Sequence, residues 1–253
     1  MIPNKIVDSA YGPMIINAND QYIGRSLEMY GAWARDDIEL IASFVNLLLQ
    51  HKPCVTLYDV GANIGTHTVA LAKHFGDRIQ IRSFEAQRQV YYLLCGNIAI
   101  NGLDNVTAHH AAVTDTANDV MQIDLPDYGL PNNFGGLELI ESQRSDNQYM
   151  TKTRSEAVTT VTVDQYTEAV DFVKLDIEGM EHIALRGARD TVSQHRPICF
   201  VEMWKTDLES VKKFFGDLDY VAYQYKPEDW LFFPKESPYG LVNGQRINLK
   251  GND

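Results

Sequence analysis

The chain of 253 residues has few cysteines, no long apolar run and fewer basic than acidic residues. Its cysteines, Cys54, Cys95 and Cys199, have neither zinc-site nor redox-motif spacing, so we expect free thiols in a reducing compartment. No apolar run reaches the ~20 residues that a membrane-spanning helix needs. The first residues also lack the apolar core of a signal peptide. We therefore expect a cytoplasmic protein without a membrane span.

Basic residues are too few for a typical nucleic-acid-binding surface. Lysine and arginine number 22 against 34 aspartates and glutamates, giving a net charge of −12, and the basic residues are dispersed. A surface that follows a phosphate backbone needs them clustered. The composition therefore favours a small-molecule or glycan partner over nucleic acid, and it leaves open whether copies of the chain form a homo-oligomer.

The chain also lacks a linker rich in proline, glycine or serine, so we expect a single domain over residues 1–253. Strand-like apolar runs alternate with helical patterns, which predicts a parallel sheet covered by helices on both faces. Two final strands follow each other too closely for a crossover helix, so the last should run antiparallel. We expect core strands at 55–60, 79–85, 106–113, 172–176, 197–201, 220–225 and 230–233, and helices at about 38–50, 64–75, 90–101, 180–192 and 208–218.

Within this domain we expect an N-terminal element (residues 1–37) that caps the ligand site, an α/β core (38–233) and a surface tail (234–253). Residues 114–160 interrupt the alternation as a loop insert with prolines, glycines and mixed charges. Long inserts of this kind are usually functional or disordered. We expect the insert to be ordered near 133–136, mobile from about 143 to 155, and to end in a short strand at 158–163.

A strand, an acidic glycine-containing turn and a helix follow one another around Asp59–Gly65. Glycine at 61 and 65 leaves room for a ligand or for the helix to approach the strand, and the helix start offers free N–H groups. A dinucleotide fingerprint reads G-x-G-x-x-G, whereas here Asn63 replaces the glycine that admits a pyrophosphate. The next strand ends on Glu85, whose carboxylate can accept both hydroxyls of a ribose. An adenosine ligand without a pyrophosphate fits best.

Further motifs follow in order, and together they resemble the FkbM family of S-adenosylmethionine-dependent methyltransferases. The resemblance covers most of residues 14–205 and implies a single-domain class I methyltransferase fold, α/β and Rossmann-like. It implies a mostly parallel seven-stranded sheet with helices on both faces and the last strand antiparallel. The motifs are Asn19–Leu27 with Tyr30-Gly31, Asp59–Gly65, Phe84–Ala86, Asn97–Leu103 and Val173–Glu181.

The resemblance also implies S-adenosyl-L-methionine as the cofactor. Glu85 would bind the ribose, Asp59 would orient the turn and the methionine ammonium, and the backbone of residues 61–65 would receive the carboxylate. Residues 111–113 would flank the adenine. Tyr22, Tyr30 and Trp33 form either a wall of the pocket or ordinary core. The expected cofactor-binding residues are Asp59, Gly61, Ala62, Asn63, Gly65, Glu85, Ala86, Ala112 and Tyr30.

Methyl transfer to a hydroxyl needs alignment and a base. Asp176 is our first candidate because it follows the fourth core strand at the cleft; Glu178, Glu202 and His182 are the others. The carboxylates of Asp176, Glu178 and Glu202 could alternatively bind Mg²⁺. On the acceptor side we expect Asn133, Gly135 and Trp204.

The family implies O-methylation of a sugar or other natural product, but other functions stay open. A neutral amine acceptor would need no strong base, so the protein could be an N-methyltransferase. It could also bind the cofactor without chemistry, or be a nicotinamide oxidoreductase. The Asn/Asp-Pro-Pro-aromatic signature of enzymes that methylate base amino groups is absent. For His67, His109 and His110 a structural role is favoured over catalysis.

Overall fold

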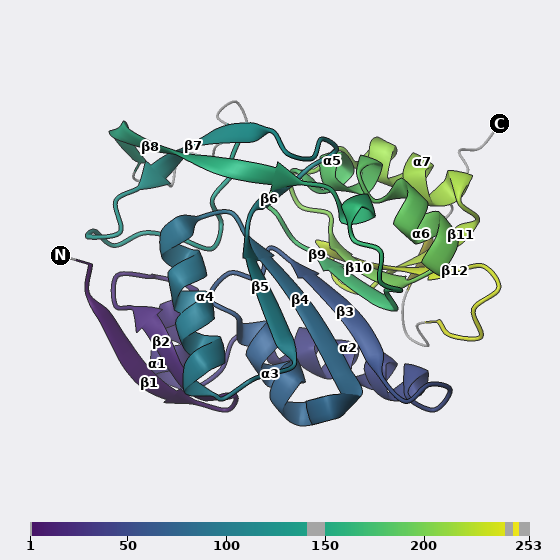
Figure 1. The fold of residues 1–253 in the computed structure, drawn as a ribbon, viewed down its shortest axis with the longest axis horizontal. Helices are drawn as coiled ribbons and strands as arrows, with labels where there is room; N and C mark the ends of the chain where they lie inside the picture. Colours follow the sequence, from purple (N-terminus) through teal and green to yellow (C-terminus); the bar gives the residue numbers. More distant parts are fainter. Residues whose placement is uncertain (1, 141–149, 241–244, 248–253) are drawn as a thin grey trace.

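Eight strands form the central sheet of the computed structural model, which describes residues 2–140, 150–240 and 245–247. Their order is β13-β11-β12-β10-β9-β3-β4-β5 (Figure 1). The five strands from β10 to β5 are parallel, and β12 is antiparallel to both of its neighbours. The bounds are β3 Val55–Val60, β4 Ile79–Glu85, β5 Val106–His110, β9 Phe172–Leu175, β10 Ile198–Glu202, β11 Tyr220–Gln224, β12 Asp229–Pro234 and β13 Gln245–Ile247.

This arrangement confirms the predicted seven strands with a late antiparallel strand. It adds one more, because β13, which lies in the expected surface tail, pairs with β11. The central strands β3, β9 and β10 are buried on both faces, as their nearly continuous apolar sequences require.

Helices cover both faces of the sheet. One apolar cluster joins α2, α3 and α4 to one face, and a second joins α5, α6 and α7 to the other. On α2, Ile38, Ile41 and Val45 recur at helical spacing and are buried. Among the described residues, no helix combines the length and apolar character needed to cross a membrane. The helices are α1 Ile23–Tyr30, α2 Arg35–Leu48, α3 Thr66–Phe75, α4 Arg88–Ile100, α5 Glu181–Arg186, α6 Arg189–His195 and α7 Leu208–Asp217.

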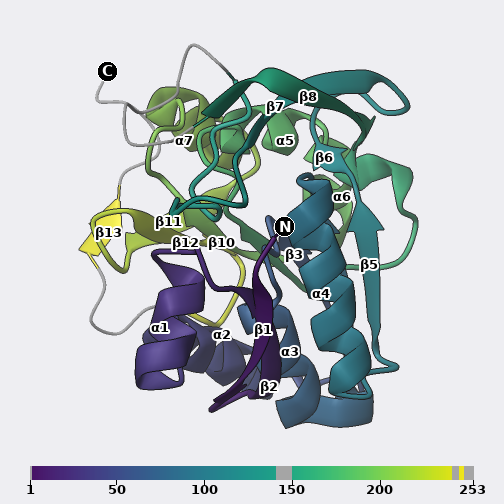
Figure 2. The ribbon, with the colours of Figure 1, turned by 90° about the vertical axis from the view of Figure 1, so that its left-hand side faces the viewer.

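The N-terminal element begins with a hairpin, β1 (Asn4–Ser9) and β2 (Gly12–Asn17), which lies against α4 (Figure 2). Asn97 of α4 is fully buried and completes this contact. Its side chain accepts a hydrogen bond from the N–H of Ile15 at 2.5 Å and donates to the carbonyl of Ile15 at 3.1 Å. A single amide thus satisfies backbone groups on β2 that no strand pairs.

Two predicted elements are wrong in their extent. The third core strand ends at His110 rather than at residue 113, and Ala112–Val113 forms β6 of a second, three-stranded sheet. The predicted helix 180–192 is two helices, α5 and α6, because the chain turns at Gly187. A side chain there would meet the carbonyl oxygen of Thr114 at 2.2 Å.

The insert is more regular than predicted. Its second sheet contains a long antiparallel pair, β7 (Val120–Pro126) and β8 (Met150–Val161), which lies near the carboxyl ends of the central strands (Figure 1). Residues 150–155 therefore belong to a strand where a loop was expected, and residues 143–149 lie outside the described part of the chain. Val158 and Thr160 are buried while Ala157 and Thr159 are exposed. This alternation is typical of a strand with one covered face.

Candidate functional site

A cavity of about 190 Å³ opens at the carboxyl ends of β3, β4, β9 and β10. Ligands of open parallel sheets bind at this edge. The wall also includes part of the N-terminal element and of the insert. Eleven residues predicted from the sequence line it: Gly61, Ala62, Asn63, Glu85, Ala86, Ala112, Asn133, Gly135, Asp176, Glu178 and Glu202.

The turn between β3 and α3 contains residues with positive φ angles and contacts the residues that end or follow the adjacent strands. Gly61 has φ +81°, a conformation that glycine adopts readily, and its backbone faces that of Asp176. Asn63 has φ +52°, which asparagine tolerates better than most residues. Its N–H donates to Glu85 Oε2 at 3.0 Å, so the turn and the end of β4 hold each other in place.

Glu85 is the buried carboxylate at the β4 side of the cavity. Its second oxygen, Oε1, accepts a hydrogen bond from the N–H of Gln87 at 2.8 Å. A carboxylate offers about four acceptor positions, so two hydrogen bonds leave capacity for a ligand. Burial raises the pKa of Glu85 to about 7, although the N–H groups of Gln87 and Asn63 act in the opposite direction.

Gln87 ties this side of the cavity to the insert. Its side-chain amide donates to the carbonyl of Phe134 at 2.8 Å, and Tyr128 donates its hydroxyl hydrogen to Gln87 Oε1 at 3.0 Å. Gly135 lies directly over the turn, because a side chain on it would meet Asn63 Nδ2 at 2.9 Å. The part of the insert near residues 133–136 is therefore ordered at the cleft, as predicted.

Beneath the turn lies a buried lysine between two aspartates. Lys174 Nζ is 3.2 Å from Asp59 Oδ1 and 3.4 Å from Asp176 Oδ2, and it donates to the carbonyl of Gly61 at 3.3 Å. Burial alone would lower the pKa of Lys174, but the two carboxylates overcome it and raise that pKa. Burial would likewise raise the pKa of Asp59, yet Lys174 holds it below its usual value. Thr68 of α3 also donates to Asp59 Oδ2 at 2.7 Å.

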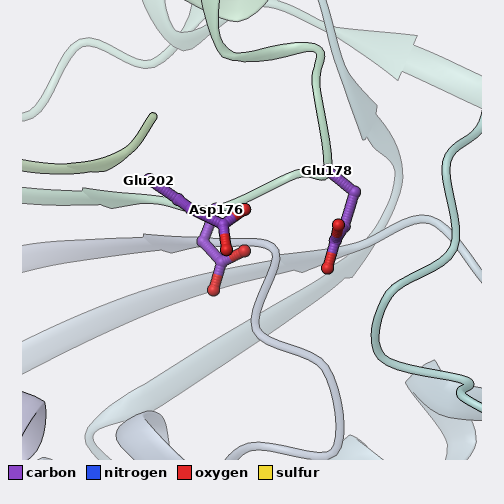
Figure 3. A group of neighbouring side chains, drawn as sticks. All are labelled: Asp176, Glu178 and Glu202. Carbon is purple, nitrogen blue, oxygen red and sulfur yellow. The ribbon is translucent and has the colours of Figure 1, made fainter. Parts of the chain in front are cut away.

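Three carboxylates meet at the β9 and β10 side. Asp176, Glu178 and Glu202 each offer an oxygen within 4.8 Å of the others, and Figure 3 shows their side chains gathered at the strand ends. Burial, then the charges of Asp176 and Glu178, raises the pKa of Glu202 to about 11. Its Oε2 is buried without a hydrogen-bond partner among the described residues. Burial followed by Asp176 also raises the pKa of Glu178.

A second lysine, Lys205, pairs with two carboxylates on this side of the cavity. Lys205 Nζ lies 2.7 Å from Glu178 Oε2 and 2.6 Å from Oε1 of Glu138, a fully buried residue of the insert. Both Glu178 and Lys205 have positive φ angles, +54° and +64°. An ion-pair network thus joins three loops at this side of the cavity.

Five predicted site residues do not line the cavity. Asp59 lies beneath it, paired with Lys174, and Gly65 lies below the turn, where a side chain would meet Leu94 of α4 at 2.7 Å. Tyr30 is 74% exposed and Trp204 52% exposed. The ring of His182 lies 3.2 Å from Thr206 Oγ1. Of the aromatic wall proposed for the N-terminal element, Tyr22 and Trp33 line the cavity and Tyr30 does not.

Two titratable residues outside the predicted site also line the cavity, Lys174 and His67. Lys174 is a charged residue inside an otherwise apolar strand, and this was the available signal, because a buried charge requires a partner. His67 had a weaker signal, namely its place at the start of the helix that follows the turn.

Comparisons with known proteins concern the family and the fold of the chain. A model of the methyltransferase FkbM domain matches residues 59–225. A methyltransferase FkbM from Methylobacillus flagellatus aligns at 19% identity and a TM-score of 0.51, over 72% of this chain and 44% of its own. The magnesium protoporphyrin IX methyltransferase of Synechocystis, solved with bound S-adenosylmethionine, aligns at 8% identity and a TM-score of 0.47, over 84% and 82%. No curated protein matches the chain.

The family model covers more than half of the chain, from the acidic turn through the three carboxylates to the end of β11. The Methylobacillus structure shows the same fold, although the chain spans less than half of that protein's length. Sequence motifs, sheet order and domain match therefore agree, and the chain belongs to the FkbM methyltransferase family.

Proposed function

We propose that the protein is an S-adenosylmethionine-dependent methyltransferase that methylates a hydroxyl group of a sugar or another small molecule, with Asp176 as the base. The observation that carries this proposal is the pairing of two acidic strand ends in one cavity. Glu85 ends β4 on one side of the glycine turn, and Asp176 follows β9 on the other.

The residues of the cavity suit this cofactor. Glu85 has free acceptor capacity for ribose hydroxyls, and the turn at Gly61–Gly65 presents backbone groups at the start of α3. Ala111 and Ala112 give a small, apolar wall beside Phe84 for a planar ring. When bound, S-adenosylmethionine supplies a methyl group on a sulfonium, which makes it susceptible to attack by a nucleophile in line.

Asp176 is better suited than Glu202 to accept the proton of an acceptor hydroxyl. Lys174 lies beside Asp176. The side chain of Asp176 is nevertheless 36% exposed and lines the cavity. Glu202 forms no ion pair within the described part of the chain, and with its pKa raised to about 11 it keeps its own proton at neutral pH. Glu202 can therefore donate a hydrogen bond, and Asp176 is left to act as the base.

The same carboxylates raise the question of a metal. Three carboxylate oxygens within 4.8 Å are ligands of the kind that Mg²⁺ prefers. However, Lys174 and Lys205 already neutralise two of the three, so we propose that the reaction needs no metal. Activity that survives exhaustive treatment with EDTA supports this view. Loss on chelation and recovery with Mg²⁺ would replace it with a metal-assisted reaction.

Isotopically labelled S-adenosylmethionine, incubated with the protein and cell extract, tests the function without a prior choice of acceptor. Mass spectrometry should find a labelled O-methyl product. The Asp176→Asn variant should bind S-adenosylhomocysteine as the wild type does and lose activity by about 10²–10⁴-fold, as expected for a missing base. If this variant kept full turnover, an amine acceptor would be favoured, because a neutral amine needs no base.

A further inference from the structure

His67 is a buried histidine on the wall of the cavity. It is the second residue of α3, directly after the glycine turn. The residue is 9% exposed, and its Nε2 atom has no hydrogen-bond partner among residues 2–140, 150–240 and 245–247. Buried polar atoms in native proteins nearly always have a partner. Because His67 belongs to the cavity wall, its unpaired nitrogen points to a ligand that supplies the partner.

The neighbours of His67 show on which side of the cavity it lies. Its pKa responds to Lys174, Asp59 and Asp176, which belong to or follow β3 and β9. Glu85 ends β4, the strand on the opposite side of β3. A ligand whose ribose is bound by Glu85 would therefore reach His67 with its other end, across the turn.

The charges around His67 favour a positive group. Burial, then Lys174, lowers the pKa of His67 to about 4, so the ring is neutral and one nitrogen can accept a hydrogen bond. The carboxylates of Asp59, Asp176 and Asp37 act on it against the cation of Lys174, and Asp37 is itself paired with Lys226. A neutral acceptor in a negative surrounding suits an ammonium group better than a carboxylate.

We propose that His67 is a cofactor-binding residue and that its Nε2 accepts a hydrogen bond from the α-ammonium group of S-adenosylmethionine. This inference rests on the proposed function and assigns one residue to the amino-acid end of the cofactor. It gives the buried nitrogen its missing partner, and it explains why a polar residue lies at this position of an otherwise well-packed helix start.

Three ligands test the proposal by calorimetry. S-adenosylhomocysteine carries both the ammonium and the carboxylate, its decarboxylated analogue keeps only the ammonium, and 5′-methylthioadenosine has neither. The His67→Phe variant should bind the first two about 10- to 100-fold more weakly, the range for a hydrogen bond to a charged group, and the third unchanged. His67→Gln, which places an amide oxygen near the position of Nε2, should recover most of the affinity. His74→Phe, on the exposed side of the same helix, should change nothing.

Other results would overturn the assignment. Equal losses for all three ligands would mean that His67 only supports the shape of the cavity. A loss for S-adenosylhomocysteine without one for the decarboxylated analogue would move the contact to the carboxylate. If wild-type protein bound none of the three, the proposed function itself would fail. If it bound all three and His67→Phe lost nothing, only the role of His67 would fail.

Discussion

Gly61 and Asp176 approach so closely that a Cβ atom on Gly61 would lie 1.7 Å from the carbonyl oxygen of Asp176. The glycine is therefore required by the contact between two neighbouring strand ends, in addition to any ligand. Asp176 in turn donates its N–H to the carbonyl of Val60 at 3.0 Å. The backbone of the glycine turn on the cavity wall is thus in direct contact with the backbone of the residue proposed as base.

Gly61→Ala should destabilise the protein far more than Gly102→Ala. Both glycines have positive φ angles, +81° and +64°, but nothing lies within 4 Å of a Cβ on Gly102. The control should lose only the conformational term, about 1–2 kcal/mol. At Gly61 the backbone collision adds to it, and we expect a loss above about 4 kcal/mol. Urea unfolding measures both, and equal losses would contradict the close contact.

Glu85 should make cofactor affinity depend on pH. Because its pKa is raised to about 7, the free protein holds a proton there below pH 7, and ribose hydroxyls donate best to the ionised form. Affinity for S-adenosylhomocysteine should therefore rise from pH 6 to 8 by up to about tenfold. Glu85→Gln should remove this dependence, and Glu85→Ala should cost about 1–3 kcal/mol of binding. A wild-type affinity that is flat over this range would argue against the ribose contact.

Lys174→Met should be strongly destabilising, because it leaves Asp59 buried without its cation. Breaking such a pair from one side costs about 3–5 kcal/mol. The double variant Lys174→Met with Asp59→Asn should be less destabilised than the sum of the two single variants, since neither charge is then left alone. Unfolding free energies of the four proteins give the coupling. Additive losses would mean that the two side chains do not depend on each other.

Glu202→Gln should become relatively more stable as the pH rises. The folded-state pKa of about 11 lies above the ordinary value of 4.5, so the native state keeps a proton that the unfolded state releases. Wild-type stability therefore falls with increasing pH through this window, whereas glutamine has no proton to lose. The difference in melting temperature between the two proteins should grow from pH 6 to 9. Each kcal/mol of difference in the free energy of unfolding corresponds to about 2–4 °C. Glu209→Gln, on an 82% exposed side chain, should show no such trend.

The sequence predicted the sheet because its core strands are apolar runs that local pattern identifies. The sequence also predicted that Glu85 and the glycine turn lie at the cavity, because each directly follows or ends such an apolar run. Lys174 was different: its partner Asp59 lies on the adjacent strand β3, 115 positions earlier in the chain, and only the register of β3 and β9 brings them together.

The exposure of Tyr30 is another difference. On α1 the buried residues are Ile23, Gly24 and Leu27, whereas Tyr30 is the last residue of the helix and is 74% exposed, although it belongs to a matched motif. Of the pair β7 and β8, only the end of β8 was predicted, because the two strands are joined through a long segment and show the weak alternation of a half-covered sheet. Such pairing depends on tertiary contacts rather than on the residues of either strand alone.

The ion pairs of Lys205 limit how the loops around the proposed acceptor site can be changed. Glu138, Glu178 and Lys205 come from three loops, and each depends on the charges of the other two. An insert transplanted from a relative would bring its own residue to position 138, and a neutral one there would leave Lys205 paired with Glu178 alone. Changing the acceptor of the proposed methyltransferase by loop exchange therefore means exchanging the three positions as a set.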